Sequence, residues 1–366
     1  MQKRLSPIQF ALLALMAPLI ATTTVYSYLI AGVGARGWWV TILLGGMITT
    51  GLGLISLSYP ISIPGRTLVG HVQYLRGRFV GALLAIPVIV TSATGVFLTL
   101  SLSNELIKAT VLPHMSTSLI WFGALIPVVF HSYHGPVTIG RHAELNLLLI
   151  YGPGLLFIAI WAMPNIRPAL LGPYIWWPHG VPFSADFWPS VLLPWGIPSL
   201  MMLTPFVDVE GVAKFRLLLW IGAISTVILI FSAGYVLGTL GPGLSRQTVE
   251  GIMTTLNLST TTILFLQQYA DLAVILILPT FWIFASSQLW SAAQAVEDVM
   301  GASFRTPALF LIAVAIWWAG STSDLGMHTI LLPLSDWLWA NLGLYLVFQA
   351  GYFMLMRQKQ KDKAYG

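Results

Sequence analysis

Apolar runs of about 20 residues recur along the whole 366-residue chain, and this recurrence limits the possible folds more than any other feature. An α-helix rises about 1.5 Å per residue, so about 20 apolar residues cross the hydrocarbon core of a bilayer. Only 8% of the residues are Asp, Glu, Lys or Arg, against roughly 25% in ordinary soluble domains. The sequence therefore predicts an all-α polytopic membrane protein.

Gly, Pro and charged residues separate the apolar runs, which predict ten transmembrane helices in one membrane domain. The predicted spans lie near residues 8–31, 38–59, 80–106, 117–133, 143–163, 190–208, 216–240, 262–293, 306–320 and 333–356. The first run follows Lys3 and Arg4 but is longer than the apolar region of a signal peptide, and more spans follow it directly. We interpret it as a retained helix.

Basic residues indicate how the spans are oriented. If the N-terminus is cytoplasmic, 13 of the 17 Lys and Arg residues fall on the inner side. Lys and Arg resist translocation, so both termini, including the tail 357–366, are predicted to be cytoplasmic. The basic residues behind the net charge of +5 are then explained by the orientation of the chain in the membrane. We therefore expect no nucleic acid partner.

The longest predicted outer connection, residues 164–189, contains six prolines and several Trp and Tyr residues. Repeated prolines prevent a continuous spanning helix, while amphipathic rings favour the headgroup layer. We expect a loop with a short interfacial helix. It divides a first group of five spans, about 8–163, from a second, about 190–356.

Two spans at corresponding positions in these halves carry helix-breaking sequences. Pro18 precedes the run Ala21–Thr24 in the first span, and Pro194, Pro198 and Pro205 interrupt the sixth. Transporters with inverted repeats bind substrate where such helices lose their hydrogen bonds near the midplane, and free backbone groups there could hold a zwitterion. Alternatively, these residues have a structural role and form no binding site, because Pro and Gly are common in membrane helices and threonines often bond to their own helix.

Few side chains suggest other chemistry. Asp271 lies within the eighth span, where an acid is either a ligand or ion-coupling residue or a bundle-facing hydrogen-bonding group. His131, His134 and His142 lack an accompanying carboxylate cluster, so we expect no metal site. The chain has no cysteine and no recognisable catalytic set or phosphate loop. We expect neither an enzyme nor a cofactor.

Several segments, taken in order, resemble the B-subunit family of nutrient germinant receptors from endospore-forming bacteria, the GerAB-type spore-germination permeases. The likeness covers nearly the whole chain. The segments that carry it are Leu5-Ser6-Pro7-Ile8-Gln9, Gly37-Trp38, Asn104-Glu105-Leu106-Ile107 with Leu112-Pro113, Gly140-Arg141, Met163-Pro164-Asn165-Ile166, and Phe265-Leu266-Gln267-Gln268-Tyr269 through Gly301.

This resemblance implies a member of the amino acid, polyamine and organocation transporter superfamily, with a LeuT-like bundle of two inverted five-helix repeats. It also implies a spore inner-membrane protein that binds a small germinant, typically an amino acid, and works with an A subunit and a lipoprotein C subunit. The implied pocket lies among spans 1, 3, 6 and 8. Its candidate wall residues are Ala21, Thr22, Thr23, Thr94, Trp195, Gly196, Ile197, Trp282 and Ser286.

The chain departs from the family pattern at positions that affect the ligand. Ile20-Ala21-Thr22 stands where the family usually has glycine, and Phe284 aligns with a basic position. Large aromatic side chains such as Trp282 and Phe284 favour a small apolar amino acid over a charged one. Two alternatives to the receptor remain: an amino acid or cation permease that performs secondary transport, and an assembly scaffold that has lost its ligand.

Overall fold

The computed structural model describes residues 4–23, 38–58, 67–153, 166–171, 202–207, 212–245, 269–323, 336–337, 339–340 and 343–344. Over these residues the regular secondary structure is helical, apart from one isolated β-bridge between Leu5 and Val207. The predicted all-α class is confirmed. The principal helices are α1 (Pro7–Thr23), α3 (Trp38–Ser58), α4 (Leu68–Arg76), α5 (Arg78–Thr110), α6 (Thr117–His134), α7 (Pro136–Leu145), α11 (Val212–Ser245), α13 (Tyr269–Met300) and α14 (Arg305–Thr322).

Most of the predicted spans correspond to these helices. Four segments are long and apolar enough to cross a membrane: Arg78–Ala109, Leu219–Gly241, Val274–Met300 and Ala302–Thr322. Pro7–Ile20 and Trp38–Ile48 are shorter apolar helices among the described residues. The larger parts of the predicted spans near 190–208 and 333–356 lie outside the described residues.

Short helical segments complete the connections. A π-helix, Asn146–Tyr151, continues α7, and 3-10 helices cover Pro168–Leu171, Thr204–Phe206 and Ala302–Phe304. The Pro168–Leu171 turn lies in the predicted outer connection and is attached to α11, since the backbone N–H of Arg167 donates to the Gly238 carbonyl at 2.8 Å.

Helix α4 was not among the predicted spans because it is short and less apolar than they are. Its first turn is capped by Thr67, whose Oγ1 accepts a hydrogen bond from the backbone N–H of Gly70 at 3.2 Å. Gly135 and Gly301, with φ of 88° and 109°, make the turns after α6 and α13. Only glycine adopts such angles without strain, so these two positions allow the chain to turn where α6 and α13 end.

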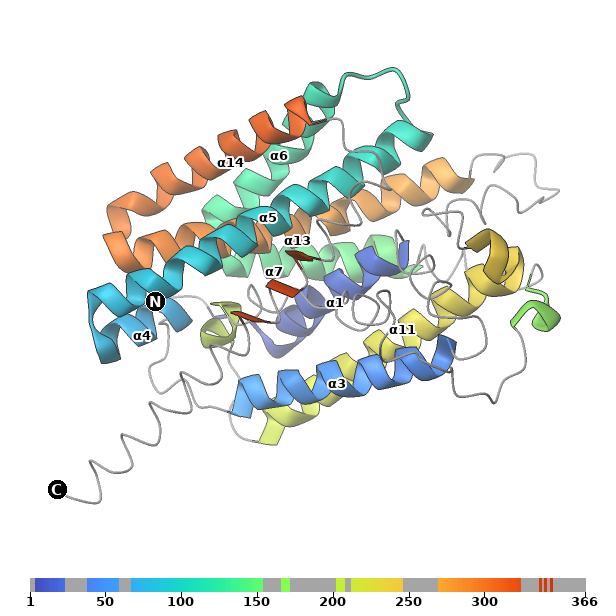
Figure 1. Cartoon of the computed structure of the whole chain (residues 1–366), viewed down its shortest axis with the longest axis horizontal. Helices are drawn as coiled ribbons and strands as arrows, with labels where there is room; N and C mark the ends of the chain where they lie inside the picture. Colours follow the sequence, from blue (N-terminus) through green and yellow to red (C-terminus); the bar gives the residue numbers. More distant parts are fainter. Residues whose placement is uncertain are drawn as a thin grey trace.

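Helix α13 occupies the centre of the arrangement in Figure 1, where it packs against α5, α6, α14, α1 and α7. Helices α3 and α11 pack against each other on one side, and α6 and α14 form a second pair on the other side. One hydrophobic core joins α1, α3, α5, α11 and α13, while a second joins α5, α6, α13 and α14. Because α5 and α13 contribute to both cores, their interface is the natural place to look for a site inside the bundle.

Candidate functional site

A small polar cluster lies between α5 and α13, formed by Thr91, Gly95, Gln288 and Trp337. The indole Nε1 of Trp337 donates to the backbone carbonyl of Thr91 at 2.6 Å. A Cβ placed on Gly95 would lie 2.9 Å from the Trp337 ring and 3.3 Å from Cδ of Gln288. The absence of a side chain at Gly95 therefore lets an indole and a primary amide meet against the backbone of α5.

Gln288 is the chemically notable member of this cluster. Its side chain is 1% exposed, and its Nε2 has no hydrogen-bond partner. A buried polar group without a partner costs about 1–3 kcal/mol, so such groups commonly mark a place where a ligand or water completes the bonding. The amide can donate to a carboxylate or carbonyl oxygen and accept from an ammonium group.

The serines beside Gln288 are already satisfied within their own helix. Ser286, Ser287 and Ser291 donate to the carbonyl oxygens of Trp282, Phe284 and Ser287 at 2.6, 2.7 and 2.8 Å. Hydrogen bonding to their own helix, the alternative considered above for threonines, thus describes these three serines as well. The longer amide of Gln288 reaches out of the helix, and sequence reasoning missed it although a Gln in an apolar span is costly enough to be noticed.

Two of the predicted wall residues, Trp282 and Ser286, lie one turn apart on α13. Ser286 is fully buried and its carbonyl accepts from Ser132 Oγ of α6 at 2.9 Å, while Trp282 packs on the core that α6 and α14 share. The Trp282 Nε1 is buried without a partner. These residues therefore belong to the α6 side of α13, roughly half a turn from Gln288.

The other predicted residues are placed as follows. Thr94 is half-buried on α5, directly before Gly95. Ala21, Thr22 and Thr23 form the last turn of α1, and Asp271 lies in the first turn of α13; only their backbone is described. Trp195, Gly196 and Ile197 lie outside the described residues. The helix α1 continues past Pro18, so the described part of the first span is helical where the sequence suggested a break.

The predicted first and sixth spans approach each other at one end. Leu5 is fully buried, and its backbone N–H donates to the Phe206 carbonyl at 2.7 Å, beside the β-bridge to Val207. Ser6 and Gln9 cap the start of α1 reciprocally at 3.2 Å, with Pro7 at the first helical position. Gln9 Nε2 also donates to Glu144 on α7 at 3.2 Å, so hydrogen bonds connect Leu5 with the Thr204–Phe206 segment and α1 with α7 at this end of the bundle.

The three histidines considered from the sequence are close together. The rings of His131 and His142 lie 4.1 Å apart between centroids, and His134 Nδ1 lies 2.8 Å from the carbonyl of Phe130. Among the described residues no group of three or more His, Cys, Asp or Glu side chains is arranged to hold a metal ion.

Comparison with solved structures identifies the fold. The chain is similar to MhsT in complex with L-phenylalanine, with 14% identity, a TM-score of 0.67, and coverage of 93% of this chain and 88% of that one. It is also similar to Mhp1, a nucleobase-cation-symport-1 family transporter, with 16% identity, a TM-score of 0.60, and coverage of 98% and 80%. A Na⁺-coupled sialic acid symporter matches at 12% identity and a TM-score of 0.56, over 94% and 78% of the two chains.

These likenesses show a LeuT-type transporter fold, as the family resemblance implied. The model of the spore germination protein family matches residues 4–323. The chain therefore belongs to the spore germination protein family. No curated protein sequence gives a significant match.

Proposed function

We propose that this chain is the B subunit of a nutrient germinant receptor, which binds a small amino acid inside a transporter-like bundle and signals germination. The observation that carries the proposal, beside the family membership, is the buried and unpartnered amide of Gln288 between α5 and α13. That amide suits the carboxylate of an amino acid, and the Trp337 ring beside it favours a ligand with a small apolar side chain.

Signalling in this proposal needs no net transport. A ligand that binds one of two bundle arrangements tenfold more tightly shifts their balance by about 1.4 kcal/mol, which is enough for a nearly balanced pair. The A and C subunits would read that shift from the spore inner membrane, with both termini of this chain in the cytoplasm. Labelling single cysteines placed near each terminus tests this topology, because the chain has no cysteine of its own.

Binding of L-alanine to the purified full chain in lipid nanodiscs tests the site. A hydrogen bond to a charged group contributes about 1.5–3 kcal/mol, so Gln288→Leu should weaken binding about tenfold or more. Ser287→Ala is the matched control, because that hydroxyl bonds only within α13. The Gly196→Leu change tests the predicted sixth-span contribution in the same assay. Unchanged affinity in Gln288→Leu would remove the α5/α13 cluster from the site.

The alternative is a permease, which the transporter neighbours favour. Liposomes containing the chain should then accumulate alanine under a proton or sodium gradient. Loss of that accumulation in Asp271→Asn would identify Asp271 as a coupling residue and promote transport over sensing. Saturable binding without gradient-driven accumulation supports the receptor.

A further inference from the structure

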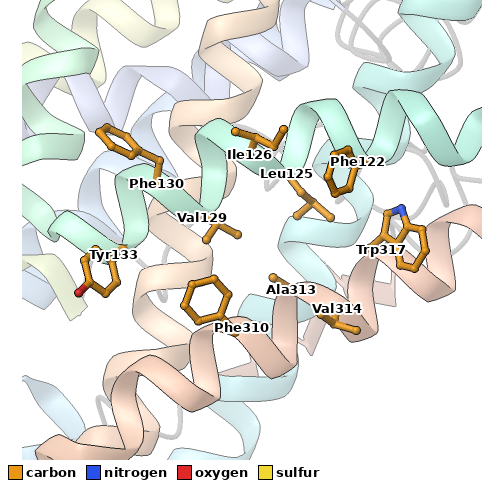
Figure 2. Close-up of a pocket in the computed structure, with 10 residues that line it drawn as sticks. All are labelled: Phe122, Leu125, Ile126, Val129, Phe130, Tyr133, Phe310, Ala313, Val314 and Trp317. Atoms are coloured by element: carbon orange, nitrogen blue, oxygen red, sulfur yellow. The ribbon is translucent and has the colours of Figure 1, made fainter.

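A groove of about 640 Å³ runs between α6 and α14 on the outside of the bundle, away from the polar cluster around Gln288. We call it the α6/α14 groove and define it by Phe122, Ile126, Phe130 and Tyr133 of α6 with Phe310 and Val314 of α14. Figure 2 shows these side chains along two neighbouring helices, with open space between them. All six are at least half exposed, and they belong to helices that we assign to the membrane. Lipid is therefore the medium that faces the groove.

The length of the groove fits one leaflet. Phe122 and Tyr133 are eleven residues apart on α6, which corresponds to about 16 Å along the helix axis. Half of a hydrocarbon core of about 30 Å is about 15 Å. A transmembrane helix from a partner would need contact across the full core, whereas an acyl chain from one leaflet needs only this half.

The side chains of the groove also favour an acyl chain over a helix. Interfaces between membrane helices are enriched in small residues that let two backbones approach closely. Here large aromatic and branched side chains form both walls, and Ala313 at the base is the small residue. A flexible chain can follow such walls, but a rigid helix would be held away from them.

One end of the groove carries the polar groups that a phospholipid headgroup requires. The Tyr133 hydroxyl points away from the apolar lining there, as Figure 2 shows. Arg305, the first residue of α14, donates from one guanidinium nitrogen to the carbonyls of Ser132 and Tyr133 at 3.2 and 3.3 Å. Its Nε lies 3.7 Å from Glu297, an ion-pair distance too long for a hydrogen bond, and its other terminal nitrogen makes no hydrogen bond to the described residues.

We propose that the α6/α14 groove binds one acyl chain of an anionic phospholipid from the leaflet at the Arg305 end, with the phosphate held by Arg305. Lipid tails are as apolar as the groove, so the tail alone gains little over bulk lipid and selectivity comes from the headgroup. Basic residues between transmembrane helices recognise anionic headgroups in this way. By the orientation predicted from the basic residues, this is the cytoplasmic leaflet.

Native mass spectrometry of the full chain tests the proposal, in micelles that contain equal amounts of phosphatidylglycerol and phosphatidylcholine with the same acyl chains. One retained phosphatidylglycerol per chain is expected, with a preference of roughly fivefold over phosphatidylcholine, which corresponds to about 1 kcal/mol for one cation. Arg305→Gln should remove the preference, and Arg305→Lys should keep most of it. Equal retention of the two lipids by the unmodified chain would overturn the headgroup assignment.

A matched pair of variants on α14 tests the groove itself. Val314→Trp places a large ring inside the groove and should lower lipid retention severalfold. Leu311→Trp makes the same change at a residue that is 73% exposed and does not line the groove, so retention should not change. Equal retention in both variants contradicts the proposal. The proposal is also contradicted if the unmodified chain forms a dimer and Val314→Trp converts it to a monomer. The groove would then be an interface between two copies of the chain.

Discussion

Helices α13 and α14 are consecutive in the chain and have nearly equal mean hydropathy, yet they occupy opposite environments. Within the most apolar part of each, 72% of the residues are buried in α13 and 17% in α14. Figure 1 shows α13 surrounded by neighbours and α14 at the edge. Hydropathy thus identifies a span but does not tell whether protein or lipid surrounds it.

The polar residues distinguish the two helices. The buried part of α13 contains Thr280, Ser286, Ser287, Gln288 and Ser291. Between residues 307 and 320, α14 contains no Ser, Thr, Asn, Gln or charged residue. Polar side chains are costly beside lipid tails, so they gather on the helix that other helices enclose. The lipid-exposed helix instead presents large apolar side chains.

The largest effect expected from this difference concerns one aromatic residue on each helix. Phe281 on α13 is fully buried, and Phe281→Ala should lower the free energy of unfolding by about 3–5 kcal/mol because it leaves a cavity. Phe310 on α14 is half exposed, and lipid can fill the space that Phe310→Ala leaves, so a loss below about 0.5 kcal/mol is expected. Unfolding in mixed detergent and SDS micelles measures both. Equal losses would contradict the assignment of α14 to the lipid boundary.

A pair of glycines should give the next largest difference. The Cβ of Gly95→Ala would lie 2.9 Å from the Trp337 ring, and overpacking of this kind costs about 1–3 kcal/mol. Gly123 on α6 is exposed and a Cβ there meets no atom within 4 Å. Gly123→Ala should therefore be neutral or slightly stabilising, because alanine favours a helix more than glycine does. Similar thermal midpoints for both variants would mean that Trp337 can move away from α5.

The sequence was sufficient to predict where most helices lie, and the reason is the low charge of the spans. The predicted span 117–133 differs by one residue from α6, and 306–320 lies inside α14. Helix α4 was not predicted because nine residues of mixed polarity carry no membrane signal. The LeuT-type fold was implied by the family resemblance, and the structural neighbours agree with it.

The candidate sites were less predictable, since each depends on contacts between distant parts of the chain. A Gln in an apolar span can be noticed in the sequence, but only the structure shows that Trp337 and Gly95 meet beside Gln288. The α6/α14 groove joins residues such as Phe122 and Phe310, which are far apart in the chain and carry no distinguishing motif. A single sequence gives the face of a helix by periodicity, but it does not give the identity of the helix that covers that face.

Disruption of one buried hydrogen bond on α13 should have a smaller effect. Asn146 Nδ2 donates to Thr280 Oγ1 at 2.9 Å, and both side chains are buried. Hydrogen bonds between membrane helices contribute on average about 0.6 kcal/mol, with a maximum near 1.7. Thr280→Val should cost an amount in that range. A double-mutant cycle with Asn146→Leu isolates the pair, and a coupling energy near zero would show that the bond adds nothing to stability.

The smallest effect is expected at the junction where α13 gives way to α14. The Glu297 carboxylate lies 3.7 Å from Arg305 Nε, and the two side chains are 26% and 28% exposed. Pairs with this much solvent contact contribute about 0–1 kcal/mol, so Glu297→Gln should barely change the unfolding free energy. Arg305→Gln should cost more, because Arg305 also donates to the carbonyls of Ser132 and Tyr133 at the end of α6. If Glu297→Gln proved as harmful as Arg305→Gln, the ion pair between α13 and α14 would contribute more to stability than the carbonyl contacts between α14 and α6.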